Sequence, residues 1–375
     1  MGNVFSSLGV KPPIAEPVVL KPAGATTSSK GFEPRTIPED AYPGLDPEWR
    51  DMWNTYGSYI KRSDEVTLEE YRQDPAKYSF SYPTYAGPEV HKVEEMSIPV
   101  SSPPGEIMIR IYSPGGPGPF PVHLNFHGGG WVVGSLESER AWCRHMCNKV
   151  GIKIIDVAYR KGPEFPFPTA IYDCWDAVKW ARANSEQINI DPQSVSFGGL
   201  SAGGHMSAVL AHFARDEGVP IKLHLMIVPA TDMRYCHRRI ERLDENNCPY
   251  ASARDLQDLP WSPLGREQWF LKYWLGDDDA AQDKAFNSWI MTPMLAKSFK
   301  DLPRAHVVTA EFDLERDEGE AYAEKLREAG NKVTSKRYKG VPHAFAHFNH
   351  PERGLSKSFE FIEDTTQLLQ DAHFT

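Results

Sequence analysis

Short apolar runs alternate with stretches of helical periodicity from about residue 94 onward. The apolar runs predict strands at residues 107–112, 122–126, 152–159, 194–200, 223–228 and 305–310, and we expect a last strand at residues 332–338. Helical stretches lie among them at residues 138–150, 170–184, 202–216 and 319–329. Strands that alternate with helices in this way predict an α/β fold, with a mostly parallel central sheet flanked by helices on both faces.

Two regions break this alternation. Before the sheet, residues 11–48 are rich in proline and predict an extended arm, followed by candidate helices at residues 47–60 and 67–73. The second of these helices begins with a capping box, because Thr67 is followed three positions later by Glu70. Residues 232–294 mix charged and aromatic side chains, and we expect this segment to be an insertion over the edge of the sheet.

The composition argues against several classes of protein. The 375 residues carry 41 basic and 51 acidic side chains, and this net charge of −10 argues against a nucleic-acid partner. The five cysteines are too few for a disulfide framework, and no Asn-X-Ser/Thr site occurs, so we expect a cytoplasmic protein. No run approaches the roughly 18 apolar residues of a transmembrane helix.

The N-terminus matches a lipidation pattern. Gly2 follows Met1, and Ser6 stands at the sixth position, as the N-myristoylation motif requires. One acyl chain on Gly2 would give only weak membrane association. The alternative is a chance match in a loosely structured N-terminus.

A Gly-x-Ser-x-Gly motif lies where the predicted strand 194–200 meets the predicted helix 202–216. Its serine is Ser201, between Gly199 and Gly203. A serine on such a sharp strand-to-helix turn needs small neighbours, and this context is typical of a catalytic nucleophile. The alternative is a glycine-rich turn with an idle serine.

A second glycine motif, His-Gly-Gly-Gly-Trp at residues 127–131, follows the predicted strand 122–126 directly. Consecutive glycines let backbone N–H groups point into a cavity without obstruction. We therefore expect the amides of Gly128 and Gly129, together with that of Ala202, to form an oxyanion hole. A flexible turn is the alternative, and the presence of two such motifs at equivalent strand ends disfavours it.

A serine nucleophile needs a base, and thirteen histidines compete for that role. His343 and Asp313 each follow a predicted strand, so both fall on the loops where sites gather in open α/β sheets. Their order after Ser201 also fits this architecture. Asp317 and Glu318 are rivals of Asp313, but they begin the next helix, where acidic residues favour the helix dipole. The expected triad is therefore serine 201, aspartate 313 and histidine 343.

Five sequence blocks resemble the hormone-sensitive-lipase family of α/β-hydrolase carboxylesterases, including its arylacetamide-deacetylase-like members. The blocks are residues 127–135, 159–173, 190–204, 313–319 and 343–345, in a match that covers about residues 95–350. The resemblance implies an α/β-hydrolase fold and a serine hydrolase that cleaves carboxylic esters of small to medium, apolar acyl or aryl substrates through an acyl-enzyme. The sequence departs from the family pattern at Leu200, His205, Leu314 and Glu315.

The resemblance also implies a helical cap. Residues 1–90 would form the N-terminal arm and cap helices, residues 232–294 the cap insertion, and residues 91–231 and 295–375 the two parts of the core. Five aromatic side chains are candidates for lining an apolar substrate pocket: Trp53, Trp131, Trp269, Trp274 and Phe345. The alternative for each of them is packing of the cap against the core.

We expect no metal and no organic cofactor, since triad chemistry needs neither, and Cys143 and Cys147 lack a second pair of zinc ligands. The expected partner is a small-molecule ester, and a homodimer is left open. One alternative is an acyltransferase, lactonase or amidase with the same triad. Another is a non-catalytic small-molecule receptor such as the plant gibberellin receptor, which resembles this family but has lost the histidine base. The presence of His343 disfavours the receptor.

Overall fold

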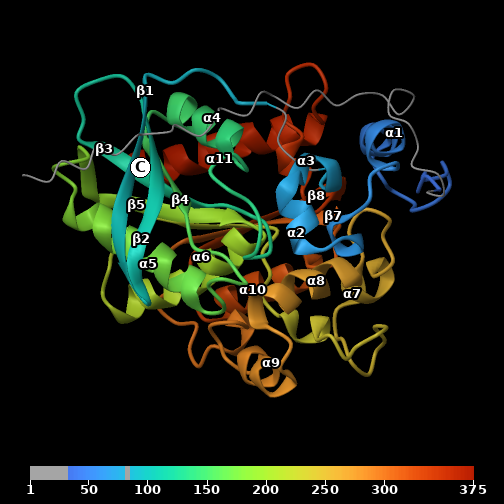
Figure 1. Ribbon diagram of the computed structural model, residues 1–375. Coiled ribbons are helices and arrows are strands. Elements are labelled where there is room, and N and C mark those ends of the chain that lie inside the picture. Colours follow the sequence, from blue (N-terminus) through green and yellow to red (C-terminus); the bar gives the residue numbers. More distant parts are fainter. Residues whose placement is uncertain (1–32, 81–84) are drawn as a thin grey trace, which may run out of the picture.

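A single sheet of eight strands forms the centre of the computed structural model, which describes residues 33–80 and 85–375 (Figure 1). The strands lie in the order β1-β2-β4-β3-β5-β6-β7-β8. Strand β2 is antiparallel to both of its neighbours, and all the other adjacent pairs are parallel. The strands are β1 Lys92–Ser101, β2 Pro104–Ser113, β3 Phe120–Phe126, β4 Lys153–Ala158, β5 Ile190–Leu200, β6 His224–Ile227, β7 Ala305–Phe312 and β8 Val333–Pro342. The expected mostly parallel sheet is therefore confirmed.

All seven predicted strands are present, with ends that shift by a few residues. Strand β1 was not predicted, because it is an edge strand in which only Ile98 and Val100 are buried. Its other positions carry exposed or half-buried side chains, including Glu94 and Glu95, so the apolar alternation that marks a strand is weak.

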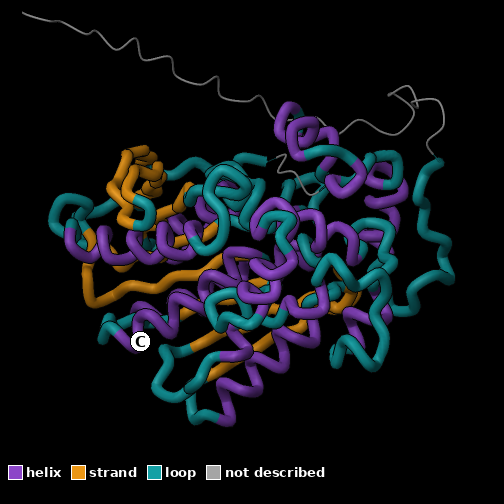
Figure 2. Tube along the Cα trace, turned by 60° about the horizontal axis from the view of Figure 1, so that its bottom comes forward, coloured by secondary structure: helices purple, strands orange, loops and turns teal. Residues whose placement is uncertain are grey.

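Helices cover both faces of the sheet (Figure 1, Figure 2). They are α1 Pro47–Met52, α2 Leu68–Gln73, α3 Pro75–Tyr78, α4 Arg140–Val150, α5 Thr169–Ala183, α6 Ala202–Asp216, α7 Ala251–Leu256, α8 Leu264–Leu275, α9 Asp279–Phe286, α10 Arg316–Glu328 and α11 Ser356–Phe374. Helices α4 and α11 pack together on one face, and α5, α6 and α10 cover the other. The predicted capping box is confirmed, because Thr67 Oγ1 accepts the N–H of Glu70 while Glu70 Oε2 accepts the N–H of Thr67.

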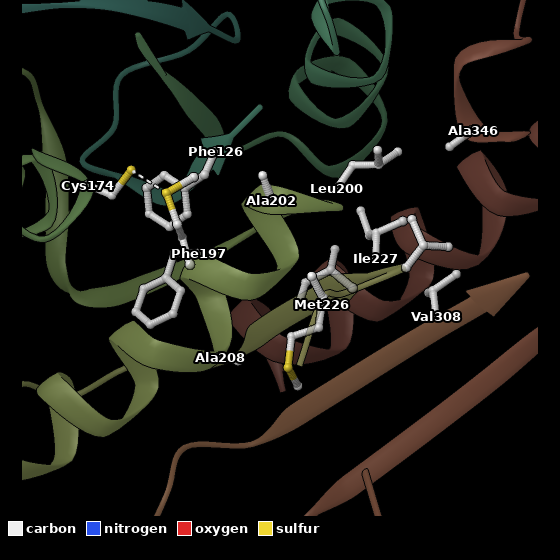
Figure 3. Packing of buried hydrophobic residues seen from close by; sticks show 14 of the residues in the cluster. Phe126, Cys174, Phe197, Leu200, Ala202, Ala208, Met226, Ile227, Val308 and Ala346 are labelled. Atoms are coloured by element: carbon white, nitrogen blue, oxygen red, sulfur yellow. Dashed lines mark hydrogen bonds between the residues drawn. The ribbon is translucent and has the colours of Figure 1, made fainter. Parts of the chain in front are cut away.

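The core beside the candidate nucleophile lies between the sheet and α6 (Figure 3). Phe126, Phe197 and Met226 come from β3, β5 and β6, and all three side chains are fully buried. The small side chain of Ala208 on α6 lets the helix approach these strands closely. The position of α6, and with it the residue that precedes it, is therefore set by dense packing.

The N-terminal helices and the insertion contact each other near β7 and β8 (Figure 1). The ring of Trp49 meets the ring of Trp261 edge-on at 5.6 Å. The indole N–H of Trp269 donates to the carbonyl of Val66 at 3.1 Å. The two segments assigned to the cap thus form one layer, although they are about 200 residues apart in the chain.

The turn between β5 and α6 lies against the end of β3. A Cβ atom on Gly203 would stand 1.8 Å from the carbonyl oxygen of Phe126, and one on Gly199 would stand 2.0 Å from the same oxygen. Both distances are far inside van der Waals contact, so only glycine fits at these positions. The predicted need for small neighbours around Ser201 is confirmed.

Gly203→Ala should therefore lower the free energy of unfolding by about 3 kcal/mol, because the obstructing atom belongs to the sheet backbone and cannot move aside. Gly265→Ala is the matched control, since a Cβ there would meet nothing closer than Asp64 Oδ2 at 3.8 Å, and it should change stability by less than about 0.5 kcal/mol. Urea unfolding curves of the two variants test this. Equal midpoints would contradict the packing argument.

Candidate active site

Ser201 joins β5 to α6 in a strained turn. Its backbone has φ 58° and ψ −115°, a combination that residues with a Cβ atom rarely adopt. The turn is held by two hydrogen bonds, from Ser201 N–H to the carbonyl of Ile227 at 2.8 Å and from His205 N–H to the carbonyl of Ser201 at 2.9 Å. Ser201 is partly buried and lines a cavity of about 210 Å³. The strain is the observation expected of a nucleophile presented at a sheet edge.

His343 and Asp313 lie on the loops that follow β8 and β7, and both are buried. Nδ1 of His343 is 2.8 Å from Oδ2 of Asp313, so the Nδ1–H donates to the carboxylate. Burial lowers the pKa of His343, but the charge and the hydrogen bond of Asp313 outweigh it and raise this pKa above 6.5. His343 lines the same cavity as Ser201. His343 is therefore paired with Asp313 and shares a cavity with Ser201 at the carboxyl edge of the sheet.

The rivals of Asp313 are engaged elsewhere. Asp317 accepts the N–H of Ser252 at 2.7 Å, and Glu318 accepts the N–H of Asp232 at 3.0 Å. No hydrogen bond or ion pair joins either of them to His343 within the part of the chain that the structure describes.

Two further carboxyl groups lie near His343 and were not predicted from the sequence. Glu315 Oε2 is 3.7 Å from His343 Nδ1, and Glu315 is almost fully buried. Glu267, on α8, is also buried and lines the cavity that contains Ser201. The only signal in the sequence was the departure from the family pattern at Glu315, which has no meaning until the loop is folded.

The glycine loop after β3 borders the same cavity, but one of its expected donors is occupied. The N–H of Gly128 donates to Oε1 of the buried Glu139 at 3.1 Å, so the prediction of this amide as an oxyanion donor is wrong. Gly129 and Gly130 have φ angles of 120° and 55°, and their N–H groups meet no acceptor among the described residues. With the N–H of Ala202 at the start of α6, they are the amides available to an anion.

His127 holds this loop in place. Its ring stacks on that of Tyr159 with centroids 4.1 Å apart, and its Nδ1–H donates to the carbonyl of Gly128 at 2.8 Å. Burial lowers the pKa of His127 to about 3, so the ring stays neutral. The tyrosine hydroxyl in turn donates to the carbonyl of His127 at 2.8 Å. The histidine of the glycine motif is therefore a support for the loop.

His205 joins three parts of the site. Burial lowers its pKa to about 4, so the imidazole is neutral. Nδ1 accepts the indole N–H of Trp131 at 3.2 Å, and the Nε2–H donates to the carbonyl of Ile290 at 3.0 Å. The side chain thus links α6 to the glycine loop and to the end of the insertion, which explains how the chain accommodates a histidine here.

A second cavity of about 50 Å³ adjoins the first, and His343 and Ala344 line both. Arg62 and Arg266 line it together with six aromatic residues: Trp49, Trp53, Tyr78, Phe80, Trp261 and Phe348. These side chains come from the N-terminal helices, the insertion and the C-terminal region. The imidazole of His343 therefore stands between a larger, mixed cavity and a small aromatic one.

Of the five aromatic residues predicted to line a pocket, only Trp53 does so. Trp131 and Trp274 are buried and stack on each other with ring centroids 4.0 Å apart. Trp269 donates its N–H to Val66, and Phe345 packs on buried aromatic rings. None of these four is among the described residues that line either cavity, because wide flat rings bury more surface against one another than against an open space.

The strained serine, the histidine–aspartate pair and the two glycine motifs together define a site of the α/β-hydrolase type. A family model described as the alpha/beta hydrolase fold matches residues 123–347. The chain belongs to this family, as its resemblance to the hormone-sensitive-lipase group implied.

Several relatives carry the names of esterases. An arylesterase of Saccharolobus solfataricus is 35% identical over 241 residues, which cover 64% of this chain and 73% of the relative. The carboxylic ester hydrolase LipN of Mycobacterium tuberculosis is 36% identical over 266 residues, 69% of this chain and 66% of that protein. The structure of a hyperthermophilic esterase from the archaeon Pyrobaculum calidifontis matches with a TM-score of 0.76 at 29% identity, and covers 87% of this chain and 98% of its own.

Proposed function

We propose that this protein is a carboxylesterase-type serine hydrolase, with Ser201 as the nucleophile, His343 as the general base and Asp313 as its partner. One observation carries the proposal: a serine in a strained strand-to-helix turn lines the same cavity as a buried histidine whose Nδ1 is 2.8 Å from a carboxylate. The esterase names of the relatives support the same activity.

In the proposed mechanism, Ser201 Oγ attacks the carbonyl carbon of the ester while His343 takes the hydroxyl proton at Nε2. Asp313 keeps the second ring proton on Nδ1 and stabilises the imidazolium that forms. The imidazolium then protonates the leaving alcohol. Water, activated by the same histidine, releases the acid from the acyl-enzyme.

Three backbone amides stabilise the oxyanion in this mechanism: those of Gly129, Gly130 and Ala202. Each such donor is worth about 2.7–4 kcal/mol at the transition state, because it is oriented before the charge develops. The carboxylate of Glu139, which binds the amide of Gly128, keeps the first turn of the loop fixed without reaching the reacting carbonyl.

The two cavities suggest how an ester binds. Ser201, Gly129 and Gly130 line the larger cavity only, so the acyl carbonyl belongs there. His343, which must reach the leaving oxygen, lines both cavities, and we therefore assign the alcohol portion to the smaller one. Leu200 and Phe270 line the larger cavity together with the charged residues Lys161 and Glu267. Small to medium acyl and aryl esters fit this division.

Other expectations remain part of the proposal. The transferase, lactonase, amidase and receptor alternatives gain no support from relatives that are named esterases. Gly2, the predicted lipidation site, lies outside the described residues. Within the described ranges, none of the helices combines the length and the apolar character needed to cross a membrane. Three expectations stay predictions: the cytoplasmic location, the small-molecule ester partner, and the helical cap at residues 1–90 and 232–294. The homodimer stays an open question.

Ser201→Ala should abolish hydrolysis of p-nitrophenyl acetate and covalent labelling by a fluorophosphonate, because it removes the attacking oxygen. Intact-protein mass spectrometry measures the labelling, and circular dichroism checks that the fold is retained. Ser207→Ala, on the buried side of α6, is the control and should leave labelling unchanged. Labelling that persists in Ser201→Ala would show that another serine is the nucleophile.

The pH profile of kcat/KM should rise with pH through a midpoint above 6.5. His343 acts as a base only when it is neutral, and the interaction with Asp313 raises its pKa, so activity appears at a higher pH than an unperturbed histidine would allow. Initial rates with a neutral ester between pH 5 and pH 9 give the midpoint. A midpoint at or below 6.5 would mean that a different group controls the acidic limb.

Trp53→Ala should raise kcat/KM for esters of bulky alcohols, such as naphthyl acetate, relative to ethyl acetate by about tenfold, because it enlarges the aromatic cavity beside His343. Trp274→Ala removes a ring of similar size that lines neither cavity, so it should destabilise the protein by about 3–5 kcal/mol and leave the ratio unchanged. The ratio of initial rates on the two esters tests this. A similar change of ratio in both variants would contradict the assignment of the alcohol site.

A further inference from the structure

Three buried carboxyl groups surround the candidate base. Asp313 is bonded to His343 Nδ1 at 2.8 Å, and Glu315 Oε2 lies 3.7 Å from the same nitrogen. Glu267 approaches from α8 and interacts with both His343 and Asp313 electrostatically. The proposed mechanism uses only one of these groups, so the presence of the other two needs an explanation.

Glu315 is placed on the same short turn as Asp313. Its N–H donates to Oδ1 of Asp313 at 3.1 Å, which fixes the two residues relative to each other. One carboxylate oxygen each from Asp313 and Glu315 and one ring nitrogen of His343 all lie within 4.8 Å of one another. Oε2 of Glu315 is buried and has no hydrogen-bond partner among the described residues, so it can move toward the imidazole without breaking a bond.

The surroundings of Glu315 control its charge. The charged groups that face it are Glu267 and Arg266 from α8, Asp313 from its own loop, Glu318 from α10 and His343 from the loop after β8. The titratable side chains of Tyr235 and Cys236, in the short helix Met233–Cys236, also interact with it. Burial raises the pKa of Glu315 well above its ordinary value, and its three acidic neighbours raise it further, while Arg266 opposes them. These effects favour the neutral form of Glu315 beside the charged Asp313.

We propose that Glu315 is a positioning residue for His343, a second acceptor for the Nδ1–H that takes over from Asp313 when the charge of Asp313 is lost. This inference rests on the proposed triad. In the intact enzyme, Glu315 stays close to Nδ1 but does not compete with Asp313 for the Nδ1–H. Two negative charges so close together in a buried site would repel each other, so ionisation of both carboxyl groups is unfavourable. When the charge of Asp313 is lost, Oε2 of Glu315, 3.7 Å from Nδ1, accepts the Nδ1–H and orients the imidazole.

The test is a double-mutant series measured with p-nitrophenyl acetate. Glu315→Gln alone should change kcat/KM by less than about threefold, because Asp313 still orients the base. Asp313→Asn alone should lower kcat/KM by about 10²-fold. Asp313→Asn combined with Glu315→Gln should lower kcat/KM by about 10⁴-fold, the loss typical of a triad without its acid. Asp313→Asn with Glu320→Gln is the matched control, since Glu320 pairs with Arg337 and not with His343, and it should equal Asp313→Asn alone.

The proposal is wrong if Asp313→Asn already loses about 10⁴-fold and the second substitution adds nothing. It is also wrong if the control double variant falls as far as the Glu315 double variant. Glu315→Leu replaces Glu315→Gln if the glutamine variant does not fold, because leucine leaves no polar group unpaired in this buried position.

A second readout does not depend on turnover. The Nδ1–H of His343 should give a downfield proton NMR signal in the intact protein and in Asp313→Asn, and lose it in the double variant. If Asp313→Asn keeps this signal and the double variant loses it, but the intact protein hydrolyses no ester, the proposed function fails while the role of Glu315 stands. If Asp313→Asn alone loses the signal, the role of Glu315 fails whatever the activity.

Discussion

The close contact between the β5–α6 turn and the end of β3 is the constraint on which the rest of the site depends. Without a Cβ at Gly199 and Gly203, the turn reaches the carbonyl of Phe126. At this turn Ser201 has a positive φ angle, and it lines the same cavity as Gly129 and Gly130 of the loop that follows β3. The close contact between the two backbones thus places the candidate nucleophile on the same cavity as the glycine loop.

The second constraint is electrostatic. His343 is buried, and burial alone would keep its imidazole neutral, but the adjacent carboxylate reverses the direction of the shift. Glu267 and Glu315 add two more buried carboxyl groups. Such groups are rare in a stable core, because an unpaired buried charge lowers the free energy of unfolding. Such local violations of packing rules are typical of functional sites. His127 and His205 are also buried, but burial lowers their pKa values and both rings stay neutral. Each ring is held by hydrogen bonds to neighbouring groups of the fold.

Much of the fold could be predicted because it depends on local patterns. Buried parallel strands need continuous apolar runs, and β3, β4, β5, β6 and β7 are recognisable for that reason. In the edge strand β1 only Ile98 and Val100 are buried, and this apolar stretch is too short to be recognised. The aromatic candidates for the pocket could not be sorted from the sequence. Trp131 and Trp274 look like pocket residues in the sequence, but their stacking is a contact between segments 143 positions apart, which no local pattern encodes.

The sequence by itself determined the type of sheet, the strand-to-helix turn at Ser201, and the order in which the serine, the aspartate and the histidine follow their strands. These features need only residue types at short spacing. The tertiary structure alone decided which amides stay free, which aromatic rings face a cavity and which carboxyl groups crowd His343. Each of those depends on side chains that meet across the fold, such as the carboxylate of Glu139 reaching the N–H of Gly128.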